Sequence, residues 1–139
     1  MKRILLLLML SALALTACSP QLTEKSAAED MQINTYRQIG MAEAVAMMEA
    51  EQDYILLDVR TQAEFEAAHI PGAICIPNET IAADEIEELP DKDQLILVYC
   101  RSGNRSKQAS DKLVALGYTN VVEFGGIIDW PGETRSGPE

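Results

Sequence analysis

The sequence is short of basic residues and of cysteine, and it contains neither an internal repeat nor a low-complexity block. Its 139 residues carry 11 Lys and Arg against 22 Asp and Glu, a formal net charge of −11. Nucleic acids are bound by basic surfaces, so this balance argues against a nucleic-acid-binding protein. Three cysteines cannot all pair with one another, which excludes a small disulfide scaffold. Hydrophobic residues still make up 47 % of the chain, a globular composition whose length fits one domain.

No apolar run is long enough for a stable membrane span. The longest, Ile4 to Leu15, is interrupted only by Ser11. As a helix it would reach about 18 Å, whereas the core of a bilayer is about 30 Å thick. The run follows Lys2 and Arg3 and precedes small residues. This order is typical of an export signal.

The export signal ends in Leu-Thr-Ala followed by Cys18. This junction resembles the bacterial lipoprotein signal, in which the cysteine becomes the lipidated first residue of the mature protein. We therefore expect residues 1–17 to be a signal peptide and Cys18 to be the lipid attachment site. The alternative is an ordinary signal peptide with an incidental cysteine. With the polar residues after it, Cys18 belongs to a predicted flexible tether over 18–31.

The lipoprotein interpretation also predicts a location and a membrane contact. The domain would be exported and held by its lipid at the outer face of a bacterial membrane, on the periplasmic side of the cell envelope. Cleavage would remove Lys2 and Arg3 but no acid. The mature domain would therefore be even more acidic than the whole chain.

The rest of the chain alternates between two apolar patterns. Short apolar runs predict strands at 36–39, 54–59, 73–76, 95–99 and 121–124. Helical spacing and start or stop signals predict helices near 41–48, from 61, at 81–89 and at 106–116. Strands that alternate with helices predict an α/β fold with a parallel sheet.

Cys100 directly follows the apolar run at 95–99 and directly precedes a predicted helix. Sites in parallel α/β sheets form at the carboxyl ends of strands, so a reactive group is expected here. Gly103 permits a tight turn that directs backbone N–H groups inward. The helix that follows adds its positive N-terminal end.

The same loop is the basic part of an acidic chain. Arg101, Arg105 and Lys107 lie within seven residues of one another. No Asp or Glu occurs in residues 94–110. These surroundings favour a thiolate, which lowers the thiol pKa and makes Cys100 a nucleophile. The alternative is a small buried cysteine at a strand end, with solvated arginines on its rim.

Three blocks, in the family's order, make the sequence similar to single-domain rhodaneses. CRSGNRS at 100–106 resembles the active-site loop, and DVRTQAEFEAAHIPGAICIP at 58–77 resembles the upstream block. GGIIDW at 125–130 resembles the downstream Gly-Gly and Trp block. The resemblance covers about residues 32–133, the expected rhodanese domain, and leaves 134–139 as a loose C-terminal tail.

The resemblance implies the rhodanese-like α/β fold, a parallel five-stranded sheet flanked by helices. It implies a sulfurtransferase in which Cys100 takes a sulfane sulfur from a donor such as thiosulfate and holds it as a persulfide. The acceptor is cyanide or a thiol, and neither a metal nor an organic cofactor takes part. The expected partners are thus small molecules, and no protein partner is identified. The loop residues expected to bind the anionic substrate are Arg101, Ser102, Gly103, Asn104, Arg105 and Ser106.

Two other activities compete with sulfur transfer. Four residues separate Cys100 from Arg105. Related phosphatases and arsenate reductases have five residues between the corresponding Cys and Arg. The shorter loop here disfavours phosphoryl chemistry. A persulfide carrier or a redox-sensing module at the cell envelope would need the same reactive cysteine. An intact Cys100 does not separate such a module from a catalyst, so this alternative stays open.

Four residues outside the loop have weaker assignments. Asp58 and Arg60 share a strand face; either Arg60 supports the region around the loop, or the two form a structural ion pair. His69 is expected to be structural. Cys75 is expected to be a buried apolar residue with a free thiol. In the family's sheet order one strand separates it from Cys100, by about 9–10 Å, beyond the roughly 7 Å limit for a disulfide.

Overall fold

The computed structural model describes residues 35–82 and 85–138. The expected signal peptide, Cys18 and the tether lie outside these residues. Within the described ranges, no helix has the length and apolar character needed to cross a membrane.

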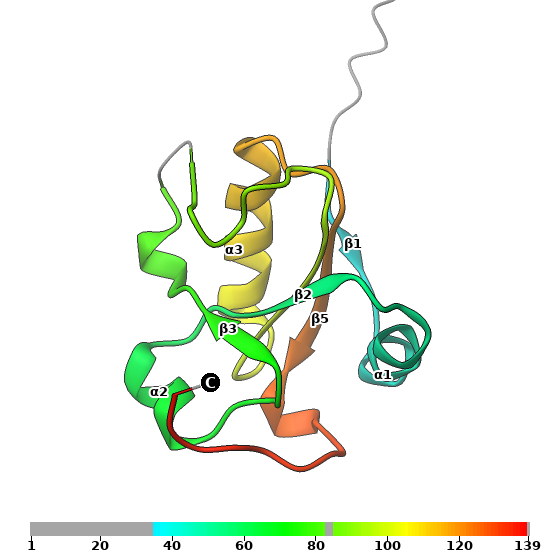
Figure 1. The fold of residues 1–139 in the computed structure, drawn as a ribbon, viewed down its shortest axis with the longest axis vertical. Helices are drawn as coiled ribbons and strands as arrows, with labels where there is room; N and C mark the ends of the chain where they lie inside the picture. The colour runs from blue at the N-terminus through cyan, green and yellow to red at the C-terminus, as the bar shows by residue number, and fades with distance from the viewer. Residues whose placement is uncertain (1–34, 83–84, 139) are drawn as a thin grey trace, which may run out of the picture. The chain divides into compact units, whose positions relative to one another are not determined.

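The described residues contain one sheet of five parallel strands, in the order β1-β5-β4-β2-β3 (Figure 1). Its strands are β1 Arg37–Gln38, β2 Tyr54–Asp58, β3 Ala73–Cys75, β4 Leu95–Cys100 and β5 Val121–Gly126. The predicted parallel α/β sheet is therefore confirmed, with every expected strand in place. The predicted separation of the Cys75 and Cys100 strands by the Asp58 strand is also confirmed, and both thiols are free.

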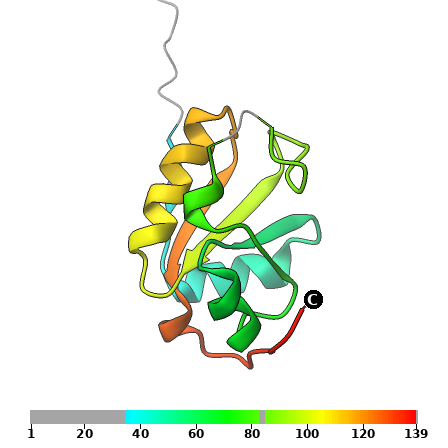
Figure 2. The same cartoon turned by 90° about the vertical axis from the view of Figure 1, so that its left-hand side faces the viewer.

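Helices cover both faces of the sheet (Figures 1 and 2). Helices α1 Met41–Ala50 and α2 Gln62–Ala67 pack on one face, and α3 Asn104–Ala115 packs on the other. Alternate residues of β4 face opposite layers, so Leu97 and Tyr99 join the core under α1 and α2. Cys100 consequently lies on the α3 face, with Ile96 and Val98.

The predicted start of α2 and end of α3 are both confirmed. The Thr61 hydroxyl accepts a hydrogen bond from the Glu64 amide at 3.3 Å, and the Glu64 carboxylate accepts one from the Thr61 amide at 3.1 Å. This reciprocal pair is a capping box, which satisfies two amides that a helix start leaves free. Gly117 follows α3 with a φ of 91°, the left-handed conformation that ends many helices.

The predicted helix over 81–89 is wrong. Its described residues form turns and irregular chain after a short 3-10 helix, η1 Asn78–Thr80. Three of its apolar side chains are buried in the core: Ile81, Ile86 and Leu89. Glu85 and Glu88 would repel each other on a helix, being three residues apart. The core contacts of the apolar residues therefore outweigh a weak helical tendency.

The C-terminal segment, predicted to be loose, is attached to the domain over its described residues. The amides of His69 and Arg135 donate to each other's carbonyl oxygens, at 2.8 and 2.9 Å. The Gly137 amide donates to the carbonyl of Glu66, in α2, at 2.8 Å. These backbone hydrogen bonds hold the segment against α2.

Candidate active site

Cys100 is the last residue of β4 and lies at the turn that begins α3. Its side chain is only 1 % exposed, and its Sγ accepts a hydrogen bond from the Gly103 amide at 3.0 Å. Gly103 has a φ of 101°, which glycine adopts without steric strain. The sequence expectation of a tight glycine turn beside the sulfur is therefore confirmed.

The surroundings of Cys100 favour its thiolate. Burial would raise the pKa of the thiol, but hydrogen bonds from the hydroxyl and amide of Ser106 and from the amides of Gly103 and Ser102 outweigh it. The net effect is a thiol pKa below its ordinary value. The first turn of α3 carries no acid, so the positive end of the helix also acts on the sulfur.

The downstream Gly-Gly pair brings β5 close to the loop. Val98 pairs with Glu123 and Cys100 pairs with Gly126, so β5 has one extra residue at this point, a β-bulge. Gly125 lies in the bulge with a φ of 96°. A Cβ on Gly126 would collide with the carbonyl of Arg101. Because these glycines have no side chains, the end of β5 can pack closely against the Cys100 loop.

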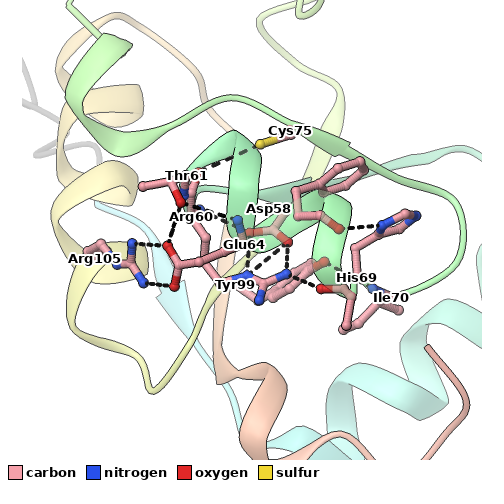
Figure 3. Close-up of polar contacts among 11 residues, drawn as sticks. Asp58, Arg60, Thr61, Glu64, His69, Ile70, Cys75, Tyr99 and Arg105 are labelled. Carbon is pink, nitrogen blue, oxygen red and sulfur yellow. Dashed lines mark hydrogen bonds and ion pairs between the residues drawn. The ribbon is translucent and has the colours of Figure 1, made fainter. Parts of the chain in front are cut away.

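Arg105 is paired with a carboxylate from α2, a contact that the sequence interpretation missed. Its Nη1 and Nη2 donate to Glu64 Oε2 and Oε1 at 2.7 and 2.8 Å (Figure 3). Both side chains are about a third exposed or less, at 27 % and 32 %. The guanidinium, through its hydrogen bonds, holds the pKa of Glu64 at about 2. Much of the charge expected from Arg105 is thus offset by Glu64.

We expect Glu64→Gln to lower the free energy of unfolding by about 0.5–1 kcal/mol at neutral pH. Glutamine keeps the capping-box acceptor but loses the charge that pairs with Arg105. The pKa of Glu64 is lower in the folded chain than its ordinary 4.5, so the stabilisation is complete above pH 4.5. It is lost as the pH falls toward about 2. Urea unfolding across this range measures the difference between wild type and variant.

Glu66→Gln is the matched control, because Glu66 lies on the same helix and its carboxylate accepts a hydrogen bond from the neutral side chain of Gln62 at 2.9 Å. It should change stability less than Glu64→Gln at neutral pH. A Glu64→Gln effect that stayed constant down to pH 3 would contradict a contribution from the ionised pair.

The predicted loop residues differ in their placement. Gly103 and Ser106 are buried, while Arg105 is half-buried. The side chains that remain exposed are Arg101, Ser102 and Asn104. Among the described residues, no group of three or more His, Cys, Asp or Glu side chains could hold a metal ion.

Asp58 and Arg60 form a buried ion pair (Figure 3). Arg60 Nε and Nη2 donate to Asp58 Oδ1 and Oδ2 at 2.9 and 2.6 Å, and Nη2 also donates to the carbonyl of Ala68 at 2.6 Å. These contacts involve β2 and the end of α2, and none reaches the Cys100 loop. Of the two interpretations offered by the sequence, the geometry matches the structural ion pair.

His69 follows α2 and Cys75 ends β3, so both lie outside the Cys100 loop. The His69 ring is buried, stacks on Phe65 at 3.8 Å and contacts its carbonyl through Nδ1 at 2.8 Å. Cys75 is half-buried, and its Sγ donates to the carbonyl of Arg60 at 3.6 Å. Burial, and then Asp58, raise the pKa of Cys75 to about 11. Its thiol is therefore a poor nucleophile near neutral pH.

Glu123 belongs to this region and escaped the sequence interpretation. It is fully buried in β5, and its Oε1 accepts from the Ser106 hydroxyl at 2.6 Å. The sequence did contain a signal for Glu123. It is an acid within the run VVEF, and a strand that is covered on both faces is expected to be apolar.

The sequence model of the Rhodanese-like domain matches residues 41–132. The chain belongs to the rhodanese family. A sulfurtransferase of Allochromatium vinosum is 42 % identical to this rhodanese over 80 residues, 57 % of this chain and 73 % of the relative. The thiosulfate sulfurtransferase PspE of Escherichia coli K12 is 37 % identical over 73 residues, 52 % of this chain and 70 % of PspE.

The solved structures lead to the same fold. An E. coli structure described as a rhodanese with anions has a TM-score of 0.56 and 33 % identity, and covers 60 % of this chain and 99 % of its own. Other curated relatives are much longer: the chain spans only 22 % of UBA4, an adenylyltransferase and sulfurtransferase of Candida albicans. The chain is thus similar both to proteins of about its own domain's size and to parts of much larger proteins.

Proposed function

We propose that this rhodanese transfers sulfane sulfur from an anionic donor such as thiosulfate to cyanide or a thiol, through a persulfide on Cys100. The observation that carries the proposal is the position of the Cys100 sulfur. It accepts the Gly103 amide at 3.0 Å, at the positive end of α3, where its thiolate is favoured. A stabilised thiolate is the species that attacks sulfur.

The first half of the reaction charges the cysteine. The Cys100 thiolate, having lost its proton to solvent, attacks the outer sulfur of thiosulfate. A new S–S bond forms, the S–S bond of thiosulfate breaks, and sulfite leaves with the electron pair. The loop amides can stabilise the negative charge throughout, because it stays on sulfur beside them.

The second half returns the enzyme to its starting state. Cyanide or an acceptor thiolate attacks the outer sulfur of the persulfide, and Cys100 leaves as a thiolate. Thiocyanate or an acceptor persulfide is the product, so no external oxidant or reductant is consumed. The amides that lower the pKa of Cys100 also make it a good leaving group.

The choice of an anionic donor follows from the charges around the loop. Arg101 is exposed, and Arg105 holds a second positive charge that Glu64 partly offsets. The first turn of α3 contributes its free amides and no acid. The relative PspE is named for thiosulfate, and the related E. coli rhodanese was solved with anions.

The proposal places this chemistry in the cell envelope. Export by residues 1–17 and lipidation at Cys18 would tether the domain to a membrane surface. The acceptor would then be a thiol or cyanide that reaches the outer face of that membrane.

We expect the purified full chain to gain one sulfur atom at Cys100 when it is incubated with thiosulfate without reductant. Intact mass detects the gain, peptide mass spectrometry locates it, and cyanide should remove it. Cys75, whose thiol pKa is about 11, serves as the internal control and should stay unmodified. Sulfur on Cys75 but not on Cys100 would overturn the proposal.

Turnover separates the enzyme from a carrier. Release of many equivalents of thiocyanate per chain, with thiosulfate and cyanide in excess, is expected of the sulfurtransferase. Release of no more than one equivalent of thiocyanate per chain would favour the carrier.

A further inference from the structure

Glu123 is a carboxylate at a buried strand position, where an apolar side chain is expected. It lies on the α3 face of β5, between Val98 of β4 and Gln38 of β1 in the sheet register, and is 0 % exposed. Burying an unpaired carboxylate is costly. No Lys or Arg is paired with it in the part of the chain that the structure describes. A role in the neighbouring site would account for an acid at this position.

The two oxygens of Glu123 have different surroundings. Oε1 accepts from the Ser106 hydroxyl at 2.6 Å and from the Gly125 amide, in the β-bulge, at 2.8 Å. Oε2 is buried and has no hydrogen-bond partner among the described residues. Glu123 therefore ties the first turn of α3 to the glycine bulge behind the Cys100 loop.

The hydroxyl of Ser106 has three acceptors within hydrogen-bond distance: Glu123 Oε1 at 2.6 Å and the carbonyls of Gly103 and Gly125 at 3.0 and 3.3 Å. It has a single proton to donate. That proton can stabilise the Cys100 thiolate, since hydrogen bonding by Ser106 lowers the pKa of the thiol. It can instead go to Glu123 Oε1, at 2.6 Å, a short distance typical of a charge-assisted bond. Of these acceptors, Glu123 and the Cys100 thiolate carry negative charge, so these two compete most strongly for the single proton.

We propose that Glu123 is a positioning residue that sets the reactivity of Cys100 by competing with its thiolate for the proton of the Ser106 hydroxyl. This inference rests on the proposed function, because it concerns the same sulfur. With the proton held by Glu123, the thiolate is more basic and attacks a sulfur donor faster. With the proton released, the thiolate is more abundant but less nucleophilic, and it leaves more readily.

Other titratable groups lie near Cys100 and Glu123. Arg105 acts on Cys100 from α3 and is itself bound by Glu64 of α2. Glu123 acts electrostatically on the phenol of Tyr36, in the segment before β1. Asp111 of α3 acts on the same phenol. The test below leaves these groups in place.

The test measures how the reactivity of Cys100 depends on pH, without any sulfur donor. The full chain is alkylated with iodoacetamide, and peptide mass spectrometry follows Cys100 separately from Cys75 and Cys18. The midpoint is the pH at which the rate of Cys100 alkylation is half of its maximum. Glu123→Gln should lower this midpoint by about one pH unit. A neutral amide oxygen competes poorly with a thiolate for the Ser106 proton. The Cys75 profile should not move.

The path through Ser106 is tested by a double-mutant cycle. Ser106→Ala should raise the Cys100 midpoint, and adding Glu123→Gln to it should then have little further effect. Equal shifts from Glu123→Gln with and without the hydroxyl would overturn the inference, as would no shift with the hydroxyl present. A direct charge effect predicts the former result and a purely structural role the latter.

Glu123→Asp provides a second variant if glutamine impairs folding. Aspartate keeps the charge but is one methylene shorter, so its carboxylate is withdrawn from Ser106. It should lower the Cys100 midpoint as Glu123→Gln does, and a midpoint equal to that of the wild type would count against the proposal. The alkylation profile remains readable even if thiosulfate never charges Cys100, so failure of the proposed function would be recognised separately.

Discussion

Cys100→Ser is expected to reduce sulfur transfer from thiosulfate to cyanide by about a thousand-fold or more. Serine fits the same buried space at the end of β4, but its hydroxyl does not ionise near neutral pH. The amides that stabilise a thiolate there would have no anion to bind before attack. An oxygen at this position also cannot form a persulfide. Thiocyanate formation, measured at saturating thiosulfate, gives the rate directly.

Cys75→Ser is the matched control for this substitution. It removes a thiol of the same size from β3, two strands away from Cys100 in the sheet. This variant should transfer sulfur at close to the rate of the wild type. Residual transfer in Cys100→Ser within tenfold of the wild type would refute the assignment of Cys100 as the nucleophile.

Asp58→Ala should have the largest effect on stability, lowering the free energy of unfolding by about 3–5 kcal/mol. The substitution leaves the Arg60 guanidinium buried without its partner, together with the Arg60 amide that donates to Asp58 Oδ1 at 2.9 Å. Small domains are stable by only about 5–15 kcal/mol. A loss of this size is therefore a large part of the total, and urea unfolding at neutral pH measures it.

A double variant distinguishes a buried charge from lost packing. Asp58→Asn combined with Arg60→Met removes both charges and keeps similar volumes. It should be more stable than Asp58→Ala, since no uncompensated charge remains in the core. If Asp58→Ala alone cost less than about 1 kcal/mol, the pair would be behaving like a solvated surface bridge.

The position of Cys100 at a strand end and beside a glycine turn was predictable because its signals are contiguous in the chain. A buried strand, the turn at Gly103 and the start of α3 follow one another directly around Cys100. Helix polarity and the glycine turn are local properties, so neither depends on a distant partner. The capping box of Thr61 and Glu64 was predictable for the same reason.

The contacts of half-buried Glu64 and of fully buried Glu123 were not predictable. Glu64 reaches Arg105 across 41 residues of sequence, and Glu123 reaches Ser106 across 17. Both contacts depend on strand order and on the packing of α2 and α3, which no local pattern specifies. The role of Arg60 was not predictable either. The sequence allowed two interpretations, and only the burial of Arg60 and its distances to Asp58 favour the structural ion pair.

The amino-acid sequence by itself determined the alternation of strands and helices, the rhodanese blocks and the position of Cys100 at a strand end. These follow from the spacing of apolar residues and from residues with strong conformational preferences. Tertiary structure decided which charges remain free around the sulfur. Core packing also replaced the expected helix over 81–89 with turns. Charges pair, and apolar side chains find the core, through contacts between distant segments, and those contacts exist only once the sheet has assembled.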